Sequence, residues 1–87
     1  MTQRMTISHI EAKVDTVNRL LGFDPAEVKW NTVGAVCLER AYGATGVRQT
    51  SNESGGERDL MGGLGTMREC AHFLNGMIQA LRIRDEF

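Results

Sequence analysis

The sequence of 87 residues contains only two cysteines, Cys37 and Cys70. Neither lies at metal-ligand spacing from a second cysteine or a histidine, so the chain has no disulfide framework and no zinc motif. We expect both to be reduced, partly buried thiols, which is typical of a cytosolic protein. A Ser-His-Asp or Cys-His arrangement and an HExxH motif are also missing. The sequence therefore predicts no enzyme, and we expect no catalytic residue, metal or cofactor.

Charge and hydrophobicity exclude further classes of protein. The formal net charge is −1 at pH 7, so no overall field attracts DNA or a membrane surface. No apolar run approaches the roughly 20 residues of a membrane span, and the start of the chain lacks the pattern of a signal peptide. The length predicts one domain, residues 1–87. Chains this short often gain stability by forming oligomers, so we expect a homo-oligomer, a dimer or a larger assembly up to a hexamer.

The first predicted helix covers residues 8–21. Ser8 and Glu11 have the spacing of a capping box, and Gly22 suits the left-handed residue that closes a helix. The segment 23–27 contains the single proline and is expected to be a turn. One face of this helix would be formed by Ile10, Val14, Val17 and Leu21.

The last predicted helix begins after a glycine-rich segment. Thr66 is a suitable N-cap, and Glu69 completes a second capping box. Apolar residues recur at helical spacing on one face beyond that point. They are Cys70, Leu74, Met77 and Leu81.

The glycine content of the middle of the chain predicts strands and turns. Eight of the ten glycines lie between Gly34 and Gly65, where each would cost a helix about 1 kcal/mol relative to alanine. Short connections between strands favour antiparallel neighbours. The expected fold is therefore α+β: a helix, an antiparallel meander of three to four strands and a second helix, with both helices on one face of the sheet. The strands are expected at residues 27–32, 34–42, 46–52 and 57–61.

Three polar positions in this meander are candidates for ligand binding. The ring of Tyr42 could stack on a base, or it could pack on a neighbouring strand. Arg48 and Asn52 lie on one face of a regular strand. A guanidinium suits phosphate oxygens, and an amide suits a base edge or a ribose hydroxyl. The alternative for this face is exposure to solvent with no ligand.

Glycines and a helix start supply the remaining candidates. Gly55 and Gly56 allow the backbone to approach a ligand, or they form an ordinary hairpin turn. Arg68 lies in the first turn of the last helix, where a cation is unfavourable for the helix itself. It could contact a phosphate near the helix N-terminus, or form a surface salt bridge with Glu69 or Glu57. The candidate ligand-binding residues are thus Tyr42, Arg48, Asn52, Gly55, Gly56 and Arg68.

The segment 28–82 resembles small bacteriophage proteins with a pattern of the form W…G…aYGG…L…NExGG…G…RE…fL.GM..aL. The family often continues YGG with a further aromatic residue, whereas this chain has Gly43, Ala44 and Thr45. The matching residues are Trp30, Gly34, Tyr42, Gly43, Val47, Asn52, Glu53, Gly55, Gly56, Arg68, Glu69, Phe73, Leu74, Gly76, Met77 and Leu81.

Within that group, the spacing of the aromatic, the asparagine and the later arginine is similar to that of the anti-Thoeris sponges. The resemblance implies an oligomer, with sites between protomers, that sequesters a cyclic ADP-ribose immune signal without cleaving it, in the cytoplasm of the host bacterium. Members of the family also bind cyclic oligonucleotides, such as cyclic di- or trinucleotides, at separate sites. By this resemblance Tyr42 would stack on adenine, Asn52 would bond the base or ribose, and Arg68 would contact the diphosphate.

Two alternatives remain open from the sequence. A phage protein of this size could inhibit a host or defence protein by direct contact, with its arginines and acidic residues forming the rim of an interface. It could also be a structural or DNA-associated phage factor, although DNA binding requires clustered cations and the sequence has no basic patch.

Overall fold

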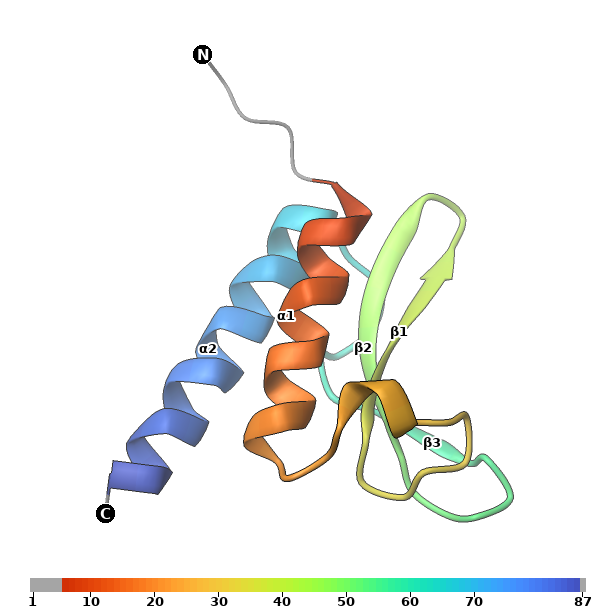
Figure 1. Cartoon of the computed structure of the whole chain (residues 1–87). Helices are drawn as coiled ribbons and strands as arrows, with labels where there is room; N and C mark the ends of the chain where they lie inside the picture. Colours follow the sequence, from red (N-terminus) through yellow and green to blue (C-terminus); the bar gives the residue numbers. More distant parts are fainter. Residues whose placement is uncertain (1–5, 87) are drawn as a thin grey trace.

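The computed structural model describes residues 6–86 and confirms the α+β prediction. A three-stranded antiparallel meander lies between two helices in the sequence, and both helices cover one face of the sheet (Figure 1). The sheet order is β1-β2-β3. The elements are α1 (Ile7–Leu20), the 3-10 turn η1 (Pro25–Glu27), β1 (Val36–Ala41), β2 (Ala44–Thr50), β3 (Glu57–Asp59) and α2 (Met67–Glu86).

Helix α1 begins slightly earlier than the sequence indicates. Its N-cap is Thr6, whose side chain makes no capping bond and instead lies 3.0 Å from the Ser8 hydroxyl. The predicted capping box of Ser8 and Glu11 is therefore wrong, because Ser8 already lies inside the helix. The other end follows the prediction, since Gly22 closes the helix with φ +97°.

The predicted strand at residues 27–32 is also wrong. Pro25 begins η1, and the Asp24 side chain accepts a bond from the Ala26 N–H at 3.0 Å. Lys29 donates its N–H to the Thr32 hydroxyl at 2.9 Å and so closes a further turn. These local side-chain bonds satisfy backbone groups that a strand would leave for a neighbour.

The remaining three strands are confirmed with shifted ends. A two-residue turn, Tyr42-Gly43 with φ values of +54° and +74°, joins β1 to β2 in place of the predicted connection at residues 43–45. Positive φ at both positions is the geometry of the tight turn that fits strand twist. At the other end of β1, Gly34 (φ +91°) and Ala35 both oppose Thr50 and form a glycine bulge.

Helix α2 begins as predicted. The Thr66 N–H donates to Glu69 Oε1 at 3.1 Å, and the Glu69 N–H donates to the Thr66 hydroxyl at 3.0 Å. The bond from the Thr66 N–H lowers the pKa of Glu69 most, and the Thr66 side chain lowers it further, because both stabilise the Glu69 carboxylate. The predicted capping box is therefore confirmed in full.

The helices run side by side in the same direction (Figure 1). Lys13 bonds Asn75 at 2.8 Å, and Arg84 bonds the Leu20 carbonyl at 2.9 Å, so the two helices are bonded to each other at two levels along their length. Between helices and sheet lies one core, and within residues 6–86 no helix covers the opposite face of the sheet. The buried core residues are Ile10, Val14, Val17, Val36, Val47, Cys70, Leu74 and Ile78.

Candidate functional site

Tyr42 lies at the tip of the β1–β2 hairpin, and its side chain is fully exposed. It does not pack on a neighbouring strand, which was the alternative that the sequence left open. The ring is therefore available for stacking, but the tip offers it no pocket in one copy of the chain.

Arg48 lies on the helix-free face of the sheet among carboxylates. Its Nη1 bonds Glu39 Oε2 at 2.9 Å, and its Nε lies 3.3 Å from Glu57 Oε1. Glu39 raises the pKa of Arg48 most, and Glu57 and Asp59 add to the increase. This guanidinium is already matched by more negative charge than it carries, so it is not a free phosphate ligand.

The neighbouring Cys37 shares these acidic surroundings. Its thiol donates to Glu57 Oε2 at 3.2 Å. Burial and this bond to a carboxylate raise the pKa of Cys37 to about 11. The cysteine is free, as the sequence predicts, and it is a poor nucleophile at neutral pH.

Asn52, Gly55 and Gly56 come together in the turn between β2 and β3. Strand β2 ends at Thr50, so the predicted strand through Asn52 is too long. The Asn52 Oδ1 accepts the N–H groups of Ser54 and Gly56, each at 3.0 Å, and so holds the turn together. Gly55 has φ +84°.

The ring of Trp30 lies against this turn. A Cβ atom built on Gly55 would come within 2.5 Å of the ring, and the indole is 71% exposed. Beside it lies a hollow of about 250 Å³ whose lining includes Lys29, Thr50 and Glu57. Trp30, which the sequence placed in no binding role, is thus the aromatic residue nearest to the glycine turn.

Arg68 is exposed in the first turn of α2, and within residues 6–86 it makes no ion pair or side-chain hydrogen bond. The salt bridge with Glu69 or Glu57, which was the alternative that the sequence left open, is not formed. The start of α2 lies near the Tyr42 end of β2, because Thr45 and Gly65 exchange backbone bonds of 2.8 and 2.7 Å.

Apart from Arg48, which lies within β2, the structure separates the predicted residues into two groups. Tyr42 and Asn52 flank the two ends of β2, a seven-residue strand with a length of roughly 20 Å. One end of the strand carries the exposed ring and the helix start with Arg68, and the other carries the glycine turn. A pocket that combined Tyr42, Asn52 and Arg68 would require more than one copy of the chain.

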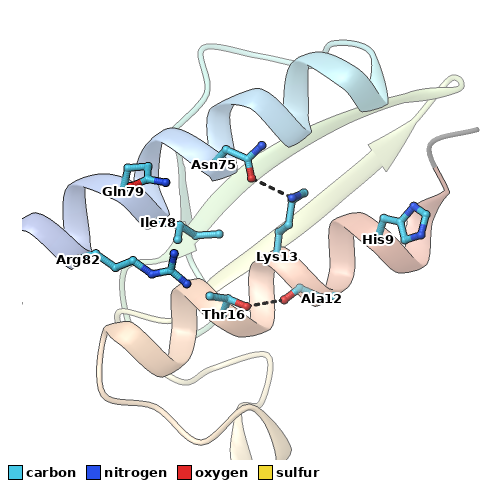
Figure 2. A pocket seen from close by; sticks show the side chains of 8 residues that line it. All are labelled: His9, Ala12, Lys13, Thr16, Asn75, Ile78, Gln79 and Arg82. Atoms are coloured by element: carbon cyan, nitrogen blue, oxygen red, sulfur yellow. Dashed lines mark hydrogen bonds between the residues drawn. The ribbon is translucent and has the colours of Figure 1, made fainter. Parts of the chain in front are cut away.

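A larger hollow than the one beside Trp30 lies elsewhere, between α1 and α2 on the surface that faces away from the sheet (Figure 2). This hollow, here called the helix groove, has a volume of about 530 Å³. Lys13 and Arg82 reach into it from opposite helices. The lining residues are His9, Ala12, Lys13, Thr16, Asn75, Ile78, Gln79 and Arg82.

The charges of the helix groove have one sign. No Asp or Glu lines it, whereas Lys13 and Arg82 contribute two positive charges. Lys13 uses one of its three donors for Asn75, and Arg82 has no hydrogen-bond partner within residues 6–86. The arrangement presents several donors to an anion of small-molecule size.

Sequence reasoning missed the helix groove, although a signal was present. His9, Lys13 and Thr16 follow each other at i, i+4 and i+7 beside the apolar face of α1, as Asn75, Gln79 and Arg82 do in α2. Only the packing of α1 on α2 brings the two polar stripes together, because about 60 residues separate them in the sequence.

The described residues contain no group of three His, Cys, Asp or Glu side chains placed to hold a metal ion. Over the same range, neither helix combines the length and the apolar character that a membrane-spanning segment requires. Comparisons of the chain with protein-family models, with curated proteins and with solved structures find no match in any of the three.

Proposed function

We propose that this is a phage anti-defence protein that binds a cyclic nucleotide immune signal, of the cyclic ADP-ribose type, and sequesters it without cleaving it in the host bacterial cytoplasm. Cyclic di- or trinucleotides belong to the same ligand class. The helix groove is the observation that carries this proposal, since Lys13 and Arg82 line it and no carboxylate does.

Size and charge of the helix groove suit such a ligand. Pockets for small molecules range from about 300 to about 1,000 Å³, and the groove has about 530 Å³. Two phosphates carry at least two negative charges, which Lys13 and Arg82 would match. The side-chain amides of Asn75 and Gln79 offer donors and acceptors to a base or a ribose.

The chemistry of the helix groove favours holding a ligand over converting it. The Thr16 hydroxyl, which is the one side-chain hydroxyl in the lining, donates to the Ala12 carbonyl at 3.0 Å within its own helix. No carboxylate is present in the groove to act as a general base, and no hydrogen bond joins His9, the other candidate base of the lining, to the Thr16 hydroxyl. Release of an intact ligand after binding is therefore the expected behaviour.

The resemblance gives a second location for the same ligand. Tyr42, Asn52 and Arg68 could meet only between copies, so this version of the site depends on the homo-oligomer that we also propose. The exposed ring of Tyr42 and the unpaired guanidinium of Arg68 are compatible with such a shared site.

Calorimetric titration tests the proposal and separates the two locations. Cyclic ADP-ribose isomers and cyclic di- and trinucleotides are titrated into the wild type, and the ligand is recovered and checked by mass spectrometry. Replacing Lys13 or Arg82 by glutamate should weaken binding by about 2–4 kcal/mol, because a charge-assisted bond is replaced by repulsion. Arg40→Glu is the matched control, since Arg40 is exposed and outside the groove.

Each outcome has a distinct meaning. Loss of binding in the Lys13 and Arg82 variants alone places the ligand in the helix groove. Loss in Asn52→Ala and Arg68→Ala, with the groove variants unaffected, places it between copies. If no ligand of the panel produces heat with the wild type, or if the recovered ligand is cleaved, the proposed function is wrong.

One observation favours the alternative function, inhibition of a host or defence protein by direct contact. The helix-free face of the sheet has three carboxylates around a single arginine, and Trp30 is exposed beside them. Exposed indole rings and charged rims are typical of protein interfaces. A silent calorimetric panel would favour this second candidate.

A further inference from the structure

The outer edge of β1 has backbone groups that are free to pair with another strand. Residues of β1 alternate between those bonded to β2 and those directed away from it. The tight turn fixes Ala41 and Ala44 as a bonded pair, so Cys37 and Glu39 also bond β2. The N–H and C=O groups of Val36, Leu38 and Arg40 are therefore directed outward.

The protein itself covers the first of these three positions. Asn18 accepts the Val36 N–H at 2.8 Å and donates to the Val36 carbonyl at 3.0 Å, as a neighbouring strand would. Within residues 6–86 no partner bonds the outward groups of Leu38 or Arg40. Exposed edges of this kind are usually covered, charged or shortened, because they pair readily with other chains.

A groove of about 380 Å³ runs beside this edge, between β1 and α1. Val14, Val28 and Leu38 give it an apolar lining. Glu11 and Asp15 add two carboxylates from α1, and no basic residue lines it. Within the described residues neither carboxylate has an ion-pair partner.

We propose that the β1 edge binds an extended segment of a partner protein as a fourth strand of the sheet. Leu38 and Arg40 would supply the backbone bonds, which is the mode of β-strand addition. Basic side chains at alternate positions of the segment would meet Glu11 and Asp15, and their aliphatic stems would contact Leu38 on the same face of the sheet. Because Arg40 is itself cationic, these basic positions lie toward the Val36 end of β1.

A second copy of the chain is a poorer occupant of this edge. Two β1 strands related by a two-fold axis, with Leu38 opposite Arg40, would place Glu39 of one copy against Glu39 of the other. Like charges directly opposite one another destabilise a strand pair. The same axis would bring Glu11 and Asp15 of the two copies toward each other. This proposal is independent of the ligand that the helix groove binds.

Hydrogen exchange of the free protein, followed by NMR, tests the edge itself. The amides of Leu38 and Arg40 should exchange rapidly, whereas those of Cys37 and Glu39 should be protected by β2. Protection of all four amides in dilute solution would show that another part of the protein already covers the edge, which would contradict a free edge. If that protection depends on protein concentration, a second copy occupies the edge, and the proposal is overturned.

Binding is tested with a capped heptapeptide of alternating valine and arginine. Its addition should shift and protect the Leu38 and Arg40 amides in the wild type. A peptide with glutamate in place of arginine should bind at least about tenfold more weakly. An arginine peptide methylated at alternate backbone nitrogens should lose affinity by a similar factor. The double variant Glu11→Lys, Asp15→Lys should lose about tenfold in affinity, whereas Glu86→Lys, at the exposed end of α2, should not.

Two further results would overturn the proposal. One is an arginine peptide that fails to protect Leu38 and Arg40 at saturation. The other is equal affinity of the methylated and unmethylated peptides, because a strand-pairing mode requires the backbone donors of the segment.

Discussion

Asn18 is the position at which a single substitution should test the edge of the sheet most directly. Its side chain is 3% exposed, and its amide makes two bonds to the backbone of Val36, which is 2% exposed. Replacement by alanine removes one acceptor and one donor together. The N–H and C=O groups of Val36 then lose their partners inside the protein.

The magnitude follows from those two groups. A buried polar group without a partner costs about 1–3 kcal/mol. Two such groups would cost about 2–6 kcal/mol, and water entering from the groove beside Asn18 reduces that cost. We therefore expect Asn18→Ala to lower the free energy of unfolding by about 2–3 kcal/mol. For a domain of 60–100 residues this corresponds to a decrease in Tm of roughly 8–24 °C.

The assay is thermal and urea unfolding followed by circular dichroism. Asn75→Ala is the control, because Asn75 also uses its side-chain amide, but in one exposed bond to Lys13. Its expected cost is below about 0.5 kcal/mol. If both alanine variants lower the free energy of unfolding by the same small amount, the paired bonds of Asn18 do not hold the edge of β1, and the reasoning is refuted.

Two glycines should respond with opposite sign to the same substitution, measured by urea unfolding. Gly55→Ala should cost about 1–2 kcal/mol, because φ is +84° and the new Cβ meets the Trp30 ring. Gly76→Ala should stabilise by up to about 1 kcal/mol, because Gly76 lies in α2 with nothing within 4 Å of the new Cβ. Alkylation of Cys37, followed by mass spectrometry, should remain slow until the pH approaches its pKa of about 11. Glu57→Gln should speed this alkylation at pH 9, since the loss of the carboxylate lowers that pKa.

The same thiol links stability to pH. The folded protein retains the proton of Cys37 at a pH where the unfolded chain has lost it, because the folded-state pKa is raised. This contribution is therefore fully present below about pH 9 and is lost as the pH rises toward about 11. Equal rates of Cys37 alkylation in the folded protein and in urea at pH 9 would contradict the raised pKa. An increase in the free energy of unfolding on Gly55→Ala would contradict the contact with Trp30.

The sequence predicted the elements that local chemistry determines. The capping box of Thr66 and Glu69, the closing residue Gly22 and the antiparallel order of the strands all depend on residues a few positions apart. The false strand at residues 27–32 shows the limit of this approach. Polar and apolar residues alternate there as they do in a strand, but the side chains of Asp24 and Thr32 accept bonds from nearby N–H groups and so favour turns.

The candidate site was harder to predict because it depends on distant pairings. Period-two alternation placed Arg48 on a polar face of its strand, but it could not show that Glu39 and Glu57 reach that face from the flanking strands. The helix groove likewise arises only when α1 packs on α2. Proximity in the sequence suggested that Tyr42 and Asn52 belong to one site, yet an extended strand is the conformation that separates two residues most.

Electrostatics finally decides which surface a phosphorylated ligand prefers. A phosphate within reach of Arg48 would have to compete with Glu39 and would lie close to Glu57 and Asp59. Two unit charges 4 Å apart near a protein surface interact by about 4 kcal/mol. Repulsion from two such carboxylates exceeds the attraction of one guanidinium at similar distance. In the helix groove the balance is reversed, because Lys13 and Arg82 face the ligand with no carboxylate in the lining. The two surfaces are thus suited to partners of opposite charge, an anionic small molecule on the helices and a basic polypeptide along the sheet.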